Sequence, residues 1–109
     1  MILDDQDNLW VCANQSDEIV VVDKNGKVVA KLGDFEGLVD DGTPKGLLFP
    51  ASPGFSRDKK TVFVTNLALD LVKGTGSAAN VAIDTPWTDQ VKHWTVSKID
   101  TRFQALPNK

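Results

Sequence analysis

Four acidic residues in a glycine-rich segment are the first candidates for metal binding. Asp34, Glu36, Asp40 and Asp41 all fall within residues 33–46. Calcium prefers carboxylate oxygens, so these side chains could hold the ion. The residue spacing of an EF-hand is absent, however, and a solvated acidic loop explains the same residues. We therefore expect no bound metal and keep these four acids as weak candidates for a calcium site.

The single cysteine and the single histidine do not predict catalysis. Cys12 lies in an apolar run, which indicates an inert core thiol and not a nucleophile. His93 has no acid or nucleophile at a spacing that would complete a catalytic set. One cysteine and one histidine also cannot build a zinc site. We therefore predict no catalytic residue.

Three tryptophans could stack on a sugar ring: Trp10, Trp87 and Trp94. Trp10 lies in an apolar strand pattern and is assigned to the core. Trp87 lies in a long segment without periodicity, so it is the tryptophan we predict to contact a ligand.

The composition is that of one small globular domain. The chain has 109 residues, of which 41% are hydrophobic and 25% are charged, which excludes wholesale disorder. A net charge of −3 argues against a general nucleic-acid binder. No apolar run approaches the roughly 20 residues of a membrane span. Residues 1–10 lack the features of a signal peptide, so a soluble, cytoplasmic protein is the default. A periplasmic or secreted location stays open if a segment is missing upstream.

Charge is distributed unevenly along the chain. Residues 1–54 hold four lysines against ten acidic residues, a net charge of −6, whereas residues 55–109 carry +3. Such a distribution would suit head-to-tail contact between copies. Chance asymmetry on two solvated faces explains it equally well.

The apolar residues of the first half recur with a period of two, which predicts an all-β fold. Residues 8–13 and 19–22 are apolar on both faces, as in strands covered on both sides. Together with residues 2–3 and 28–32 they predict four antiparallel strands in sequence order. Asn25-Gly26 between the last two predicts a type I′ hairpin turn.

The second half repeats this pattern less clearly. Residues 33–46 are predicted to be a loop, and residues 46–49 to begin a strand bent by Pro50 and Pro53. A polar turn at 56–60 leads to a strand at 61–67. Residues 68–90 form a long loop, residues 91–99 a last strand, and residues 101–109 a tail.

The two halves have the character of a repeat. Trp10 and Phe63 occupy equivalent positions 53 residues apart, and the acidic loop accounts for much of the excess over about 45 residues. Four strands at such a period are typical of a β-propeller blade. We therefore expect one β domain over residues 1–109. It contains about two four-stranded antiparallel blades, at 1–36 and 44–100, and forms an incomplete propeller.

Residues 3–32, LDDQDNLWVCANQSDEIVVVDKNGKVVAKL, resemble a known blade sequence. They are similar to the pattern D-x-x-G-N-L-W-V-A of the senescence-marker-protein/gluconolactonase-like six-bladed propellers. They also resemble NHL-type repeats, which share this blade pattern. Pro44 to Leu47 and Thr61 to Thr65 look like the start of the next blade. The resemblance covers roughly residues 2–67 and is to the C-terminal blades of that family.

The resemblance implies one divalent metal, usually calcium, that polarises a lactone carbonyl in the central channel. The family's ligands precede each innermost strand. For the first blade that position falls before Met1, and for the second it is Lys45-Gly46, where lysine cannot bind calcium. No catalytic or metal-binding residue of the family therefore carries over.

A closed propeller needs about 4–8 blades, and this chain encodes about two. We therefore expect a non-enzymatic scaffold that self-associates, with a trimer as first choice and a strand-exchanged dimer as second. The alternative is a calcium-dependent sugar-lactone hydrolase whose site needs upstream blades or an oligomer axis. The residues encoded upstream of Met1 would discriminate between the two.

Overall fold

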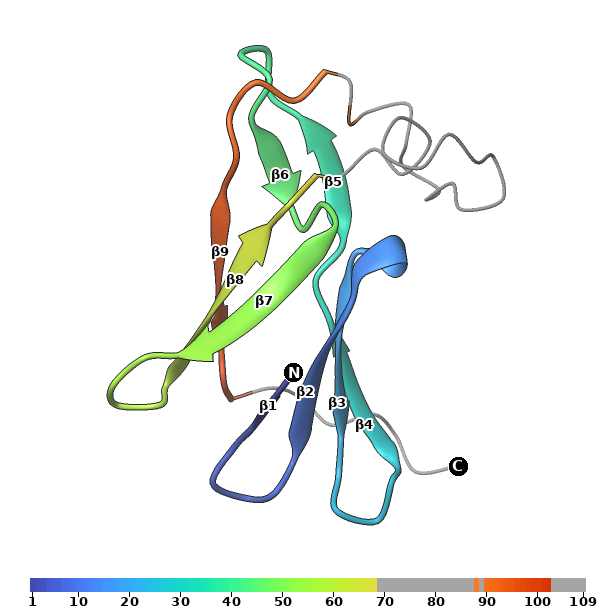
Figure 1. Cartoon of the computed structure of the whole chain (residues 1–109), viewed down its shortest axis with the longest axis vertical. Helices are drawn as coiled ribbons and strands as arrows, with labels where there is room; N and C mark the ends of the chain where they lie inside the picture. The colour runs from blue at the N-terminus through green and yellow to red at the C-terminus, as the bar shows by residue number, and fades with distance from the viewer. Residues whose placement is uncertain (69–87, 89, 103–109) are drawn as a thin grey trace.

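The computed structural model describes residues 1–68, 88 and 90–102, and this part of the chain is dominated by antiparallel β-structure (Figure 1). Sheet one has the order β1-β2-β3-β4, a hairpin pairs β5 with β6, and sheet three has the order β7-β8-β9. The strands are β1 (Ile2–Leu3), β2 (Leu9–Ala13), β3 (Glu18–Val22), β4 (Val28–Leu32), β5 (Phe35–Leu38), β6 (Pro44–Gly46), β7 (Pro50–Phe55), β8 (Thr61–Asn66) and β9 (Val96–Asp100).

Sheet one confirms the prediction of four antiparallel strands in sequence order. Its register places Trp10 opposite Val21, and Cys12 opposite Ile19. Because directly opposed residues point to the same side of a sheet, one face collects Trp10, Val21 and Ala30. The other face of these two strands is also apolar, so the alternation alone does not decide which side of the sheet enters the core.

The turn between β3 and β4 differs from the predicted type I′ turn. Gly26 has a positive φ of 81°, but Asn25 is not among the residues with positive φ. The Gly26 amide donates to the Asp23 carbonyl at 2.9 Å, and the Asp23 amide donates to Lys27 at 2.8 Å. This is a type I turn closed by a left-handed glycine. The Asp23 carboxylate accepts hydrogen bonds from the Asn25 and Lys27 amides, and this local bonding favours the observed turn.

Residues 33–46, predicted to be a loop, form the β5–β6 hairpin. Phe35 and Leu38 pack against a second cluster of buried residues, which comprises Leu48, Ala68 and Val91. The turn rests on residues distant in the sequence, because the Gly42 carbonyl accepts the Lys92 amide at 2.9 Å. The glycine and aspartate residues hid the strand pattern in the sequence. The hairpin is stabilised by these contacts with distant residues and not by the strand propensity of its own residues.

The strand predicted to begin at residues 46–49 and to pass through Pro50 and Pro53 starts later than expected. β7 instead begins at Pro50 and contains Pro53, which is tolerated because β7 is an edge strand of sheet three. Residues 47–49 form a buried connector between β6 and β7. Likewise β9 begins at Val96 and not at Val91. The amides of Lys92 and His93 both donate to the Gly42 carbonyl. These backbone groups therefore bond to the β5–β6 turn and not to a neighbouring strand.

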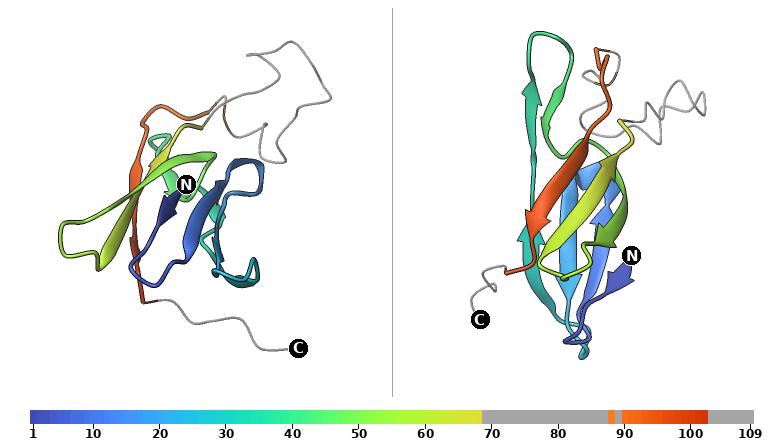
Figure 2. Two further views of the ribbon diagram at one scale, coloured as in Figure 1. Left: turned by 60° about the horizontal axis from the view of Figure 1, so that its bottom comes forward. Right: turned by 90° about the vertical axis from the view of Figure 1, so that its left-hand side faces the viewer.

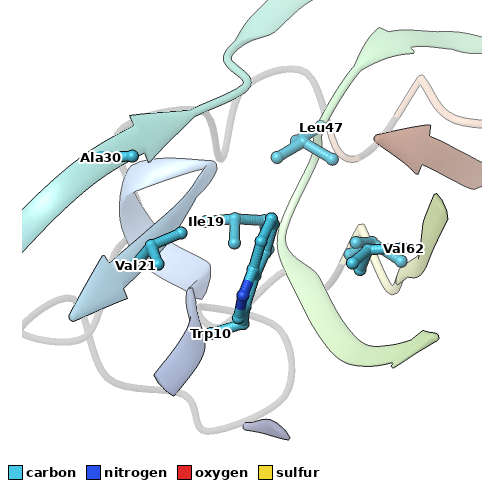
Figure 3. Packing of buried hydrophobic residues seen from close by; sticks show 7 residues of the cluster. Trp10, Ile19, Val21, Ala30, Leu47 and Val62 are labelled. Carbon is cyan, nitrogen blue, oxygen red and sulfur yellow. The ribbon is translucent and has the colours of Figure 1, made fainter. Parts of the chain in front are cut away.

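The main core lies between sheet one and sheet three, which lies across one face of sheet one (Figure 2). Trp10 is fully buried at its centre, between the side chains of sheet one and Val62 of β8 (Figure 3). Its ring meets Phe55 edge-on, with centroids 6.2 Å apart and an interplanar angle of 78°. The cluster comprises Trp10, Ile19, Val21, Ala30, Leu47, Val62 and Val64.

Candidate functional site

The predicted ligand contact, Trp87, lies outside the described residues, as does most of the predicted loop at 68–90. Trp94 is described and is 65% exposed. Its indole N–H donates to the Leu67 carbonyl at 3.0 Å, which fixes the ring at the end of sheet three.

The acidic candidates for calcium lie along the β5–β6 hairpin. Asp34 precedes β5 and Glu36 lies within it, whereas Asp40 and Asp41 lie in the turn at the other end. The Asp34 carboxylate accepts the Phe35 amide. The Asp41 carboxylate accepts hydrogen bonds from Thr43, which lower the pKa of Asp41. Within residues 1–68, 88 and 90–102, no three His, Cys, Asp or Glu side chains come together as a metal site.

The remaining residues considered for chemistry are dispersed. Burial raises the pKa of the half-buried Cys12 thiol, which favours its neutral form. His93 is exposed on the segment between the hairpin turn and β9. Lys45, at the position where the resemblance would need a metal ligand, is exposed in β6. The structure therefore does not bring these three residues together.

A pocket of about 400 Å³ lies where the first turn, the β7–β8 turn and the end of β9 meet, and the sequence did not reveal it. It is lined by Asp4, Asp5, Gln6, Phe55, Lys59, Thr101 and Arg102. Sequence patterns could not show this pocket because its walls come from three distant segments.

The charged groups at this pocket already pair with one another. Lys59 contacts the Asp5 carboxylate at 2.7 Å and so links the turns of the two sheets. Arg102 donates to both oxygens of Asp100, at 3.1 and 2.7 Å, and these hydrogen bonds lower the pKa of Asp100 to about 2. An incoming ion would have to displace one of these pairs.

Asp4, on the inner wall of the pocket, organises the first turn. One carboxylate oxygen accepts the amides of Gln6 and Asn8, at 2.8 and 2.9 Å. The other accepts the Asn8 side-chain amide at 3.0 Å and the Trp10 indole N–H at 2.9 Å. Burial alone would raise the pKa of Asp4, but the hydrogen bonds from Trp10, Asn8 and Gln6 outweigh it and lower the pKa. An acid this well satisfied is suited to holding a turn, not to proton transfer near neutral pH.

The outer face of sheet one, opposite the core, carries six apolar side chains together with Lys31 and Glu18. Its register aligns Leu3, Leu9, Val22 and Val28 in one row. The next row pairs Val11 with Val20 and continues to the exposed Lys31 of β4. Leu3 is 62% exposed and Val28 is 38% exposed. None of these six residues belongs to either buried cluster or packs against one.

Sheet three also presents apolar residues on its outer face. Phe63 is 41% exposed in β8, and Val96 is 58% exposed in β9. Leu67 and Trp94, which are hydrogen-bonded to each other, extend this row past the strand ends. The two outer faces are candidate binding surfaces of the described chain, and the sequence pattern of residues 8–13 and 19–22 indicated only the one on sheet one.

No protein-family model, no curated protein and no solved structure matches this chain. Among the described residues, no helix is long and apolar enough to cross a membrane.

Proposed function

We propose that this chain is a non-enzymatic β-scaffold that self-associates through the outer faces of its two main sheets. The observation that carries the proposal is the outer face of sheet one, where Leu3, Leu9, Val11, Val20, Val22 and Val28 lie together outside the core. Scattered exposed apolar residues are ordinary, but a contiguous patch marks an interaction surface.

The size of this surface limits how strongly copies can associate through it. One strand of two residues and three strands of five residues, at 3.3 Å per residue and about 4.8 Å between strands, give a face of about 270 Å² in projection. Covering Val or Leu side chains completely contributes about 1.5–3 kcal/mol each. These side chains are already partly buried in one copy, so the free energy gained by covering each of them is smaller. A face of this size is smaller than the roughly 800 Å² that each partner buries in a standard specific interface, so it supports only weak association.

The arrangement of the strands supports a propeller-like assembly as part of this proposal. Sheet one has four strands in sequence order and sheet three has three, and their inner faces pack together. Two such sheets are too few to close a propeller, whereas three copies would supply six. A trimer is therefore our first choice and a strand-exchanged dimer the second. The alternative is a calcium-dependent lactonase whose site needs upstream blades or an oligomer axis. Among the described residues of one copy, no three His, Cys, Asp or Glu side chains come together.

Light scattering coupled to size exclusion, over a concentration series up to about 100 μM, tests the proposal. The wild-type chain is expected to exceed its monomer mass of 11.9 kDa and to dissociate on dilution. Val11→Lys, which places a charge in the outer face of sheet one, is expected to shift the mass toward the monomer. Gln15→Lys is the matched control, because Gln15 is exposed in the 3₁₀ turn Asn14–Ser16 and off this face. A well-folded wild-type monomer at every concentration would refute the proposal.

A further inference from the structure

We infer that the open edge of β9 pairs, antiparallel, with β9 of a second copy, so that sheet three continues across two chains. This contact goes beyond the outer-face contact proposed above, because it uses the backbone groups of a strand edge and not an apolar face. It joins copies in pairs about a two-fold axis, so each copy presents the same strand to the other.

β9 lies at one end of sheet three, and β8 is the one described strand that pairs with it. Figure 2 (right) views the molecule from the side of β9 and shows the strand running along this edge. The ladder between β8 and β9 contains five consecutive pairs, from Thr65–Val96 to Thr61–Asp100, without a register shift. The edge is therefore long and regular enough to accept a further strand.

The other edge strands of the described sheets carry features that discourage such pairing. β1 has only two residues, and Pro53 of β7 has no amide hydrogen to offer a partner. The pairing of β4 with β3 contains a register shift, as does the pairing of β5 with β6. Short strands, prolines and bulges protect sheet edges, because an open edge is a template for another strand. The β9 edge has none of these three features, so a partner strand is expected there.

The hydrogen bonds at the two ends of β9 show which of its backbone groups are directed outward. The Asn66 amide donates to the Thr95 carbonyl at 3.0 Å, and the Thr101 amide donates to the Lys60 carbonyl at 3.0 Å. Successive residues of an antiparallel strand direct their N–H and C=O groups to opposite sides, so residues 95, 97, 99 and 101 face β8. Three residues therefore direct their backbone groups to the open edge: Val96, Lys98 and Asp100.

Charge favours a second copy of β9 as the partner strand. A two-fold axis at Ile99 places Lys98 of each copy opposite Asp100 of the other, and both side chains are exposed on the same face. An axis at Lys98 would oppose two lysines, and an axis at Ser97 would oppose Lys98 to Val96. Opposite charges in directly paired positions stabilise a sheet, whereas like charges destabilise it. The register centred on Ile99 is therefore the favoured one.

A pair of substitutions at position 98 tests whether the edge is used. Lys98→Pro removes the outward amide and places a ring where the partner strand would lie, whereas Lys98→Ala removes only the charged side chain. Both are made in the Val11→Lys chain, in which the outer face of sheet one is blocked. Light scattering over the concentration series given above is expected to show a dimer for the Val11→Lys chain. Lys98→Ala should weaken this dimer by about tenfold, and Lys98→Pro should leave a monomer.

The fold of the proline variant is checked separately. A proline is tolerated on an edge strand where its nitrogen faces away from the ladder, and position 98 meets this condition. Far-UV circular dichroism verifies that the variant is folded. If Lys98→Pro does not fold, the charge-reversal experiment decides alone.

Charge reversal tests the register and the identity of the partner. In the same Val11→Lys chain, Lys98→Asp would oppose acids at both paired positions, and Asp100→Lys would oppose lysines. Each variant alone is therefore expected to be a monomer, whereas an equimolar mixture is expected to form a heterodimer of twice the chain mass. Lys24→Asp is the matched control, because it makes the same change of charge in the exposed β3–β4 turn and should remain a dimer.

The outcomes separate this inference from the outer-face proposal. If the wild type associates but Val11→Lys is a monomer, the edge contact is overturned and the outer-face proposal stands. Equal dimers from a folded Lys98→Pro and from Lys98→Ala also overturn the edge contact. Charge-reversal variants that stay monomeric when mixed overturn the pairing of two β9 strands. If Val11→Lys is as large as the wild type and Lys98→Pro makes it a monomer, the outer-face proposal fails and the edge contact stands.

Discussion

Asp4 is expected to be a principal polar anchor of sheet one, and its replacement provides a quantitative test of the structure. Asp4→Asn keeps an oxygen that can accept the amides of Gln6 and Asn8, but it places an NH₂ group where the second oxygen stood. That oxygen accepts the Trp10 indole N–H at 2.9 Å. The substitution therefore sets one donor against another beside the core, while the volume of the side chain hardly changes.

The expected loss follows from the kind of bond removed. A hydrogen bond to a charged group contributes about 1.5–3 kcal/mol to the free energy of unfolding. Asp4 is partly exposed, so water replaces some of the lost bonding, and we expect a loss of about 2 kcal/mol. With a urea m-value of about 1–3 kcal/mol/M, the midpoint falls by about 1 M. Trp10→Phe removes the same N–H while keeping an aromatic ring, so a double-mutant cycle isolates the pair, with an expected coupling of about 1 kcal/mol.

The effect has a defined pH dependence. The folded-state pKa of Asp4 lies below its ordinary value of 3.8. The carboxylate therefore contributes its full stabilisation above the unfolded-state pKa, and this contribution is lost as the pH falls through the folded value. The stability difference between wild type and Asp4→Asn should be constant from pH 7 to about pH 5 and then shrink. Urea denaturation followed by far-UV circular dichroism measures it without relying on tryptophan fluorescence. Equal midpoints at pH 7, or a difference that persists unchanged to pH 2, would refute this account of Asp4.

The remaining predictions concern turns and metal. Gly26→Val should lower the free energy of unfolding by more than about 1 kcal/mol, because φ is 81° there and a β-branched residue resists that conformation; an unchanged urea midpoint would show that the turn is misassigned. Asp7→Gly should stabilise by about 0.5 kcal/mol, since Asp7 has a φ of 62° in a turn of the same kind, and a lower thermal midpoint would contradict this. The isolated chain should bind calcium no more tightly than millimolar and should not hydrolyse gluconolactone. Micromolar affinity in calorimetry, or turnover above background, would overturn that expectation.

The fold was most predictable where the apolar pattern and the turn chemistry agree. Residues 28–32 were predicted as a strand and form β4 with the same bounds, and the strands around Trp10 and Val21 differ by one residue. Prediction was wrong where backbone groups bond to distant segments. Residues 91–95 contain the β-favouring Val91, Trp94 and Thr95, but the Lys92 amide donates to Gly42, 50 positions earlier. A local pattern carries no information about such a partner.

The polar residues that position the sheets were likewise predictable only where their hydrogen bonds are local in the sequence. The bonds of Asp4 all fall within six residues, so the spacing of Asp4, Asn8 and Trp10 could have indicated them. Asp17 and Asn66 could not be found in this way, because their acceptor oxygens bond the amides of Phe49 and Leu48, 32 and 18 positions away. The acidic residues considered for metal binding were chosen because four carboxylates occur within a short stretch of sequence. The structure distributes them along a hairpin and does not gather them.

The buried connector at 47–49 determines how the two outer faces are oriented. It forms no strand, so its amides need other acceptors, and burial makes an unpaired amide costly. The Phe49 amide donates to the Asp17 carboxylate at 2.7 Å, and the Leu48 amide donates to the Asn66 side chain at 3.1 Å. Both acceptors are only 3% exposed. One belongs to the end of sheet one and the other to sheet three, so together they fix the angle between the sheets. In the proposed assembly, the outer faces would set the strength of association, and this connector would set the angle at which copies meet.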